Sequence, residues 1–352
     1  MNRRAILYAL ASAALFGIST PAAKTLLGTI HPVTLAALLY LGAGVGAFVL
    51  RRVFRSTINR RAREVALSRV EMPWLIGAII AGGIVGPILL LVGLRITEAA
   101  TASLLLTLEG VVTALMAWFL FHENFDRRIA LGMACIVMGA IVLSWSGTPT
   151  IGGIIGPLAI AGACVAWALD NNLTRKVSLG DPLQIVELKG LIAGPVNFGL
   201  ALAVGAEIPQ ATTATIAAIV GFLGYGVSLA LFVLALRHLG TARTGAYFST
   251  APFLGALASI MGLGEPVSIQ LLLAGALMSL GVWLHLTEHH EHEHVHEPMA
   301  HAHPHLHDEH HRHEHAPDDP PGEPHTHWHR HDWLKHSHAH VPDMHHQHRH
   351  EN

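Results

Sequence analysis

Ten apolar runs, each about as long as the stretch of helix that crosses a bilayer, constrain the fold of this chain more than any other feature. They lie near residues 5–27, 31–50, 72–94, 98–121, 128–146, 151–170, 183–204, 212–236, 242–262 and 266–286. Only 13% of the 352 residues are charged, whereas soluble domains carry about 25%. The first run is also longer than the apolar part of a cleaved signal peptide. The sequence therefore predicts an all-α integral membrane protein with ten transmembrane helices.

The basic residues predict how these helices are oriented. Fifteen of the eighteen Lys and Arg residues before residue 288 fall in segments that share one side of the membrane when the N-terminus is cytosolic. Short cytosolic loops are enriched in Lys and Arg, and the opposite orientation would have to translocate RRVFRSTINRRAREVALSR. We therefore expect both termini in the cytosol and the protein in the plasma membrane of a prokaryote.

The second half of the chain repeats the first half. One constant shift along the sequence pairs LRITEAATASLLLTLEGVVTALMAWFLFHE, which ends at Glu123, with LRHLGTARTGAYFSTAPFLGALASIMGLGE, which ends at Glu265. A slightly longer shift, which takes Pro32 to Pro182, pairs HPVTLAALLYLGAG with DPLQIVELKGLIAG. Each half holds five spans, an odd number, so the two halves must face opposite ways. Inverted repeats of this kind are typical of secondary transporters.

Two of these segments also carry a family resemblance. LEGVVTALMAWFLFHE and STAPFLGALASIMGLGE resemble the paired signature of EamA-like transporters in the drug/metabolite transporter superfamily. The resemblance covers residues 5–286 and implies a carrier that exports or exchanges small organic metabolites. Gly110 departs from a proline that the first repeat often has, and Leu39 departs from a basic residue that Lys189 supplies in the second half. We expect two repeats, 1–147 and 148–287, that divide gating and binding unequally.

Ionisable groups at bilayer depth point to the transport path, because they usually face a cavity or a partner. Glu109, with Thr107 close by, lies near the centre of the fourth span. It is the candidate for proton or cation coupling, and a hydrogen bond between helices is the alternative. The further candidates for the substrate path are Asp170, Asn171, Glu187, Lys189, Trp167 and Tyr247.

Each of these further candidates has a structural alternative. Asp170 and the two asparagines after it would cap the end of the sixth span. Glu187 and Lys189 are two residues apart and project in different directions on a helix, so at most one of them faces the path. Trp167 and Tyr247 would anchor at the interface or pack in the core.

The segment 288–352 differs from the rest of the chain, because 24 of the 28 histidines lie between His289 and His350. Its composition predicts disorder. Repeated His-x-His suits zinc, nickel, cobalt or copper; a solvating tail and a pH-sensing tail are the alternatives. The expected ligands are His292, His294, His296, His301, His303, His305, His307, His325, His327, His329, His331, His336, His338 and His340. HEHEH matches a zinc-protease pattern only formally, since a protease needs it on a helix beside a cleft.

Taken together, these features predict a secondary transporter, an exporter or exchanger of a small organic metabolite, with a cytosolic metal-binding regulatory tail. Two alternatives stay open: an exporter of nickel, cobalt or zinc, and a membrane-anchored metal sensor. We expect no enzymatic activity, no required cofactor and no nucleic-acid partner. The expected partners are the lipid bilayer, a small-molecule solute, divalent metal ions and, as an open alternative, a second copy of the chain.

The predicted topology can be tested with two single cysteines, Arg60→Cys and Ser268→Cys. The odd number of spans in each repeat requires residue 60 in the cytosol and residue 268 outside. A membrane-impermeant thiol reagent should therefore label the cysteine at 268 in intact cells, and the one at 60 only after the membrane is opened. Labelling of both from the same side would contradict the inverted repeat.

Overall fold

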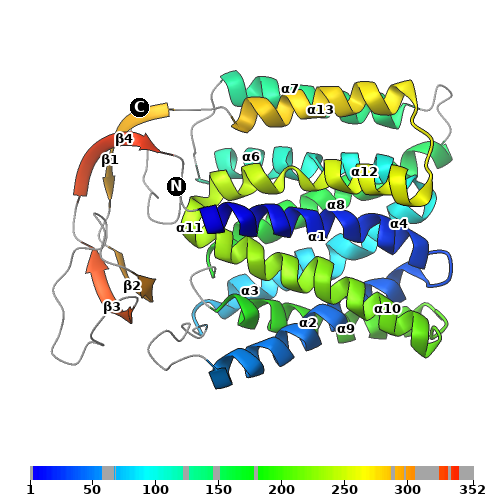
Figure 1. The fold of residues 1–352 in the computed structure, drawn as a ribbon, viewed down its shortest axis with the longest axis horizontal. Helices are drawn as coiled ribbons and strands as arrows, with labels where there is room; N and C mark the ends of the chain where they lie inside the picture. Colours follow the sequence, from blue (N-terminus) through cyan, green and yellow to red (C-terminus); the bar gives the residue numbers. More distant parts are fainter. Residues whose placement is uncertain are drawn as a thin grey trace.

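The computed structural model describes residues 3–57, 67, 69–121, 127–145, 151–177, 181–286, 290–296, 299–305, 325–331 and 334–340. In the first half the helices are α1 (Arg3–Leu26), α2 (Pro32–Thr57), α3 (Met72–Ala78), the π-helical segment η2 (Ile79–Val85), α4 (Gly86–Ile96), α5 (Ala99–Leu105), α6 (Leu108–Phe121) and α7 (Arg127–Ser144). In the second half they are α8 (Ile151–Arg175), α9 (Pro182–Ala203), α10 (Ala211–Gly221), the π-helical segment η3 (Phe222–Val227), α11 (Ser228–Phe248), α12 (Ala251–Leu263) and α13 (Ile269–Leu286). Their axes run roughly in one direction, so the helices form a bundle (Figure 1).

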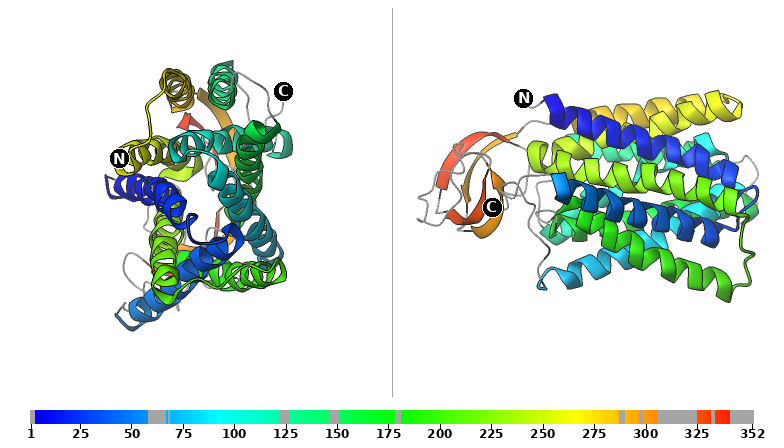
Figure 2. Two further views of the ribbon diagram at one scale, coloured as in Figure 1. Left: turned by 90° about the vertical axis from the view of Figure 1, so that its right-hand side faces the viewer. Right: turned by 60° about the horizontal axis from the view of Figure 1, so that its bottom comes forward.

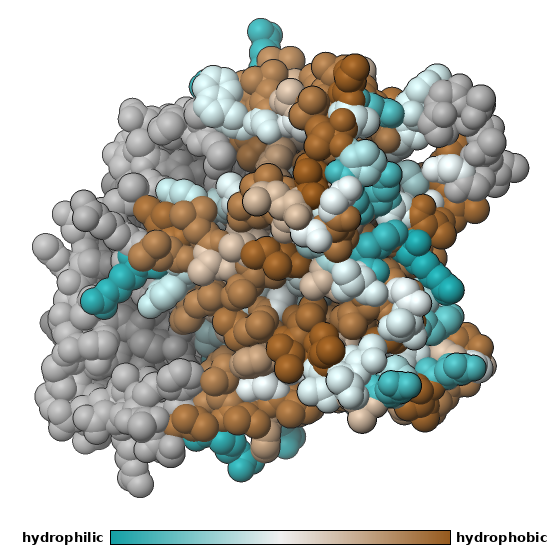
Figure 3. Space-filling model, turned by 45° about the vertical axis from the view of Figure 1, so that its right-hand side comes forward, coloured by the Kyte–Doolittle hydropathy of each residue, from teal (hydrophilic) through white to brown (hydrophobic). Residues whose placement is uncertain are grey.

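The helices of this bundle have the length and apolarity that a bilayer requires. Among the described residues, eight helical segments are long and apolar enough to cross a membrane, and α12 and α13 are shorter apolar helices. A helix pairs its backbone N–H and C=O groups within its own segment, which lipid demands because it offers no partners. Apolar side chains cover most of the face seen in Figure 3. The prediction of an all-α membrane protein is confirmed.

Helix α11 contains the turn between the predicted eighth and ninth spans. The ring centroids of Phe232 and Phe248 are 5.0 Å apart. In a straight helix, the rise along the axis would separate these two positions by about 24 Å. The chain therefore reverses direction inside α11, and the residues after the reversal continue into α12. The interruption at Ser249 and Thr250 makes α12 short, because α12 begins only at Ala251, with Pro252 in its first turn.

Close contacts between α7 and α13 show a twofold relation between the two halves. Gly139 of α7 approaches the backbone of Ala274 in α13, and Gly281 of α13 approaches the backbone of Gly132 in α7. The sequence shift that takes Glu123 to Glu265 converts the first contact into the second. Such an exchange is what a twofold relation between the two halves produces.

The α2–α9 pair repeats this exchange with the other shift. Gly44 of α2 packs against Leu191 of α9, and Gly194 of α9 packs against Leu41 of α2. The shift that takes Pro32 to Pro182 converts one contact into the other. In the view along the helices, the α7–α13 pair lies at one edge of the bundle (Figure 2, left). The remaining helices enclose the middle of the bundle, where polar side chains gather.

Charged groups join the helices at both ends of the bundle. Both carboxylate oxygens of Glu265, which follows α12, accept hydrogen bonds of 2.7 Å from the backbone N–H groups of Ala99 and Ala100 at the start of α5. At the opposite end, the Arg51 guanidinium pairs with Asp181 at 2.9 Å. Each of these contacts ties the first half of the chain to the second. Arg60 and Glu123 lie outside the described residues.

The tail carries backbone pairing that its composition does not predict. Strand β1 (His290–His296) pairs antiparallel with β4 (Leu334–His340), and β2 (Met299–His305) pairs antiparallel with β3 (His325–His331). The prediction of disorder for the rest of residues 288–352 lies outside the described residues. The alternation of histidine with other residues has the period of two that a strand requires, so the segments suit a ladder once a partner strand is available.

The α7–α13 contact predicts a difference between two glycines. A Cβ atom on Gly281 would lie 2.5 Å from the carbonyl oxygen of Gly132, whereas a Cβ atom on Gly262 would meet nothing within 4 Å. Because backbone cannot move aside as a flexible side chain does, Gly281→Ala should destabilise the protein by about 1–3 kcal/mol. Thermal unfolding of the purified variants in detergent measures this. The matched Gly262→Ala should unfold at the parental temperature, and equal melting of both variants would contradict the packing.

Candidate functional site

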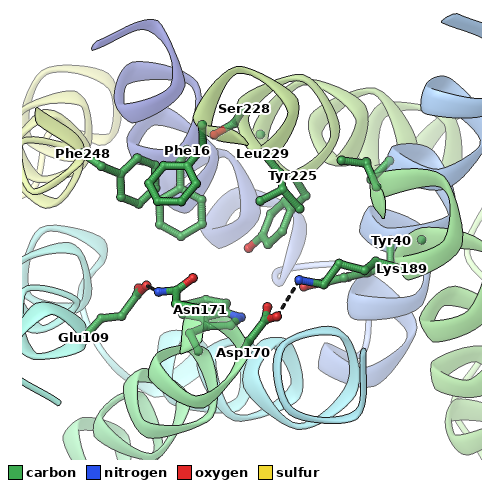
Figure 4. A pocket seen from close by; sticks show the side chains of 16 residues that line it. Phe16, Tyr40, Glu109, Asp170, Asn171, Lys189, Tyr225, Ser228, Leu229 and Phe248 are labelled. Carbon is green, nitrogen blue, oxygen red and sulfur yellow. Dashed lines mark hydrogen bonds and ion pairs between the residues drawn. The ribbon is translucent and has the colours of Figure 1, made fainter. Parts of the chain in front are cut away.

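A cavity of about 710 Å³, including its open mouth, lies in the middle of the bundle where the two halves meet. Its walls come from α1, α2, α6, α8, α9, η3 and α11. Small-molecule sites are typically concave and mostly apolar, with a few convergent polar groups. Figure 4 shows the polar side chains of Glu109, Asn171, Asp170 and Lys189 along one side, with aromatic rings facing them.

A buried ion pair forms part of the polar wall. The Lys189 Nζ lies 2.5 Å from the Asp170 Oδ1. The Thr174 hydroxyl donates to the same oxygen at 2.8 Å, and Lys189 donates to that hydroxyl at 3.1 Å. Lys189 is 3% exposed and Asp170 is 7% exposed. Charges taken so far from water are stable only when paired and hydrogen-bonded, so each of these groups holds the other in place.

Glu109 is held differently, by a neutral partner. The Asn171 side-chain amide donates to the Glu109 Oε1 at 2.7 Å. Glu109 lies in the first turn of α6, directly after the interruption at Leu106 and Thr107 that separates α5 from α6. The N-terminal end of a helix favours a negative charge. Glu109 therefore has a partner of its own, separate from the Asp170–Lys189 ion pair.

Aromatic rings form the wall opposite these polar groups. Phe16 of α1 packs edge-on against Tyr225 of η3 at 5.9 Å and lies 5.5 Å from Phe248 at the end of α11. Tyr225 also lies 5.6 Å from Tyr40 of α2. The cavity thus pairs a charged wall with an aromatic one. Such a lining suits a small amphipathic solute.

The π-helical segment η2 supplies backbone acceptors to this region. A π-helix interrupts the regular ladder and is frequent at functional sites. The carbonyl oxygen of Gly82 accepts hydrogen bonds from the Tyr40 hydroxyl and, at 3.1 Å, from the Trp167 Nε1. The carbonyl oxygen of the next residue, Gly83, accepts from the Asn197 side chain at 2.9 Å. These bonds fix the orientation of two aromatic side chains that line the cavity.

Five of the candidates named from the sequence line this cavity. They are Glu109, Asp170, Asn171, Lys189 and Trp167. The alternative of a helix cap for residues 170–172 is wrong, because α8 continues to Arg175. The further turn forms because Asp170 bonds to Thr174, one turn later, and to Lys189 of α9.

Three candidates lie elsewhere. The Thr107 hydroxyl donates to the Leu104 carbonyl within the interruption, at 2.7 Å. Glu187 pairs with Arg51 at 2.8 Å, while Lys189 faces the cavity, as the two-residue spacing predicts. Tyr247 packs against the small cluster that contains Ala5 and Ala235. The proposed histidine ligands fall in β1–β4, apart from His307, which lies outside the described residues.

Sequence reasoning missed the aromatic wall. Phe16, Tyr40, Tyr225 and Phe248 stand in apolar runs, where rings that pack against lipid and rings that line a cavity look the same. The repeat offered one indirect signal. The shift that takes Glu123 to Glu265 also takes Gly82 to Gly224, so the two π-helical segments occupy equivalent positions. Tyr225 lies next to Gly224, and Trp167 bonds to the carbonyl of Gly82.

The comparisons with known proteins agree with this architecture. The EamA-like transporter family matches residues 3–145 and 154–287, once in each half. The chain belongs to the EamA-like transporter family. It is 30% identical to an uncharacterized transporter of Methanothermobacter thermautotrophicus over 282 residues, which is 76% of this chain and 82% of that one. It is 24% identical to the uncharacterized transporter YyaM of Bacillus subtilis over 213 residues, 55% of this chain and 66% of that one.

A solved structure shares the EamA-like fold of this chain. A protein crystal structure superimposes with a TM-score of 0.61 and 18% sequence identity, covering 81% of this chain and 96% of the other. At this identity the likeness concerns the fold alone. The family and the relatives thus make this chain a membrane transporter, and the substrate has to be argued from the cavity.

The buried ion pair predicts a specific pattern of stability. Asp170→Asn or Lys189→Met alone leaves an unpaired buried charge and should cost about 3–5 kcal/mol. The double variant removes both charges and should lose less than either single variant. Thermal unfolding in detergent gives the comparison, and Glu187→Gln is the control because Arg51 keeps Asp181 as a partner. Single variants that are as stable as the double variant would contradict the coupling.

Proposed function

We propose that this chain is a secondary transporter that exports or exchanges a small organic metabolite through the cavity between its repeats. The observation that carries the proposal is the lining itself, which sets Glu109 and the Asp170–Lys189 ion pair against Phe16 and Tyr225. A solute with an ammonium or carboxylate group and an apolar body would meet a partner on each wall. Inverted-repeat transporters bind their substrates at this position, near the middle of the membrane between the halves.

The lining favours an organic solute over a metal ion as the substrate. Nickel, cobalt and zinc sites draw on imidazole or thiolate ligands. Glu109 and Asp170 are the acidic residues of the described lining, which holds neither histidine nor cysteine, and Lys189 neutralises Asp170. Within the described part of the chain, no group of three or more His, Cys, Asp or Glu side chains stands close enough to hold a metal ion.

The proposal also includes the orientation of the bundle, the two repeats and the tail. With the termini in the cytosol, the end of the bundle that holds Arg51 and Asp181 faces the cytosol, and the end that holds Glu265 faces outward. Residues 1–147 and 148–287 act as the two repeats, and residues 288–352 are a metal-binding regulatory tail. A metal exporter and a membrane-anchored metal sensor are the alternatives.

The solute can be identified before the mechanism is tested. A strain that lacks the gene is grown with graded amounts of amino-acid analogues and, separately, of nickel, cobalt and zinc salts. Sensitivity to an organic compound, followed by uptake of that compound into liposomes that contain the purified protein, supports the proposal. Sensitivity to metal salts alone supports the metal exporter, and failure to move any solute supports the sensor.

Glu109 is proposed as the site that couples transport to protons. Its amide partner leaves it free to bind a proton, whereas Asp170 is held by Lys189. Glu109→Gln should abolish accumulation of the solute driven by a pH gradient while exchange of solute for solute continues. Uptake into liposomes with and without the gradient measures both. Glu187→Gln, outside the cavity, should keep both activities, and a normal pH-driven rate in Glu109→Gln would make this carboxylate structural.

A further inference from the structure

The cavity extends from the middle of the bundle toward the end that holds Arg51. Helix α9 begins at that end, beside Asp181, and its lining residues Val186 and Lys189 lie in the first half of the helix. Helix α8 finishes at the same end, and its lining residues lie in its second half. The opposite end of the bundle, which holds Glu265, therefore lies beyond the floor of the cavity.

Buried side chains fill the bundle between this floor and the end that holds Glu265. Ser19 of α1 lies so close to Gly224 that a Cβ atom on the glycine would collide with it. Farther along α1, Leu26 belongs to a cluster of buried apolar side chains that also contains Leu94 of α4. The structure thus shows a conformation in which the cavity is closed at the Glu265 end.

Two charged side chains hold the corner between α4 and α5, residues 94–100, at this closed end. Glu265 accepts hydrogen bonds of 2.7 Å from the first two backbone N–H groups of α5. Lys24 of α1 donates at 2.7 Å to the carbonyl oxygens of Leu94 and Thr97, at the end of α4. The first N–H groups and the last C=O groups of a helix have no partner within the helix. Each charge therefore satisfies backbone groups that the corner would otherwise leave unpaired.

The Glu265 contact is strong, yet it can be exchanged for bonds to water. Hydrogen bonds to an ionised group are stronger than those between neutral groups. The corner lies at an end of the bundle, where water can replace either partner, whereas polar groups inside lipid have no such substitute. Glu265 belongs to the second half of the chain and the corner to the first. The contact must therefore break when the two halves separate at this end.

We propose that Glu265 is a positioning residue of the transport cycle, which holds the corner of residues 94–100 while the cavity is closed at this end and releases it when this end opens. Lys24 keeps the corner in the shape that Glu265 binds. The inference rests on the proposed role of the cavity as the transport path, because a carrier of this kind opens its central site to the two sides in turn. Glu265 acts through the corner on the balance between two conformations and does not line the described cavity.

The access of a thiol reagent to the cavity tests this role. The parental chain for the test carries Leu229→Cys, a cavity position, as its single cysteine, with Cys135 and Cys164 replaced by alanine. A membrane-impermeant thiol reagent is added to right-side-out and to inverted membrane vesicles. A companion chain with Ser268→Cys, close to Glu265 in the sequence, identifies the preparation that exposes the Glu265 end. The parental chain should label faster from the opposite end.

Glu265→Gln should change the two labelling rates in opposite directions. The variant keeps the shape of the side chain but loses its charge and one of its two acceptor oxygens. Labelling from the Glu265 end should rise roughly tenfold or more, and labelling from the other end should fall, because the balance between two conformations shifts. A merely loosened fold would speed labelling from both ends. Lys24→Gln should shift the rates in the same directions, and it decides the matter if Glu265→Gln fails to insert.

Glu98→Gln is the matched control. Glu98 lies in the same corner, but in the described part of the chain its side chain accepts no hydrogen bond from the start of α5, so the parental rates should persist. Three results would overturn the inference: parental labelling that is faster from the Glu265 end, parental rates in Glu265→Gln, and an equal effect of Glu98→Gln. Labelling needs no solute, so the proposed transport function is judged separately, by uptake into liposomes.

Discussion

The need to pair every backbone polar group inside lipid governs this structure. An unpaired N–H or C=O group in the bilayer costs several kcal/mol, so the chain departs from regular helix only where other partners are at hand. Among the described residues, the departures within the spans include η2, η3 and the interruptions at 106–107 and 249–250. At η2 the carbonyl of Gly82 finds partners in Tyr40 and Trp167, both of which line the cavity. The side chains that line the cavity thus supply the hydrogen bonds that the irregular backbone of η2 needs, and η2 in turn orients those side chains.

The repeat gives the two halves the same backbone but not the same chemistry. Gly82 and Gly224 occupy equivalent positions, and Gly82 packs against Asp170 where Gly224 packs against Ser19. In the α2–α9 pair, fully buried Leu39 stands in the place of Lys189. The ion pair thus belongs to one half alone. In a motion of one repeat against the other, Asp170 and Lys189 would therefore move with the second repeat, and Leu39 would move with the first.

Hydropathy and the repeat predicted the all-α membrane fold, because both depend on patterns that extend over the whole chain. Glu109, Asp170 and Lys189, which line the cavity, were conspicuous because each is a charge in an apolar run. The aromatic wall was not predictable, because a ring such as Phe16 is as apolar in a cavity as against lipid. The tail strands were missed for another reason: their pairing joins segments that lie far apart in the sequence, such as His290 and His340, and composition carries no such information.

The position of the tail in the chain limits how it can act on transport. The last helix before it, α13, packs mainly against α7, and this pair lies at the edge of the bundle (Figure 2, left). Neither helix contributes a residue to the described cavity lining. Among the described helices, α13 also contacts α5 and α11, and α11 lines the cavity. A change in the tail would therefore reach the cavity through these contacts of α13. Such a route suits a regulator that shifts the balance between two conformations, and it does not suit a channel of metal from tail to cavity.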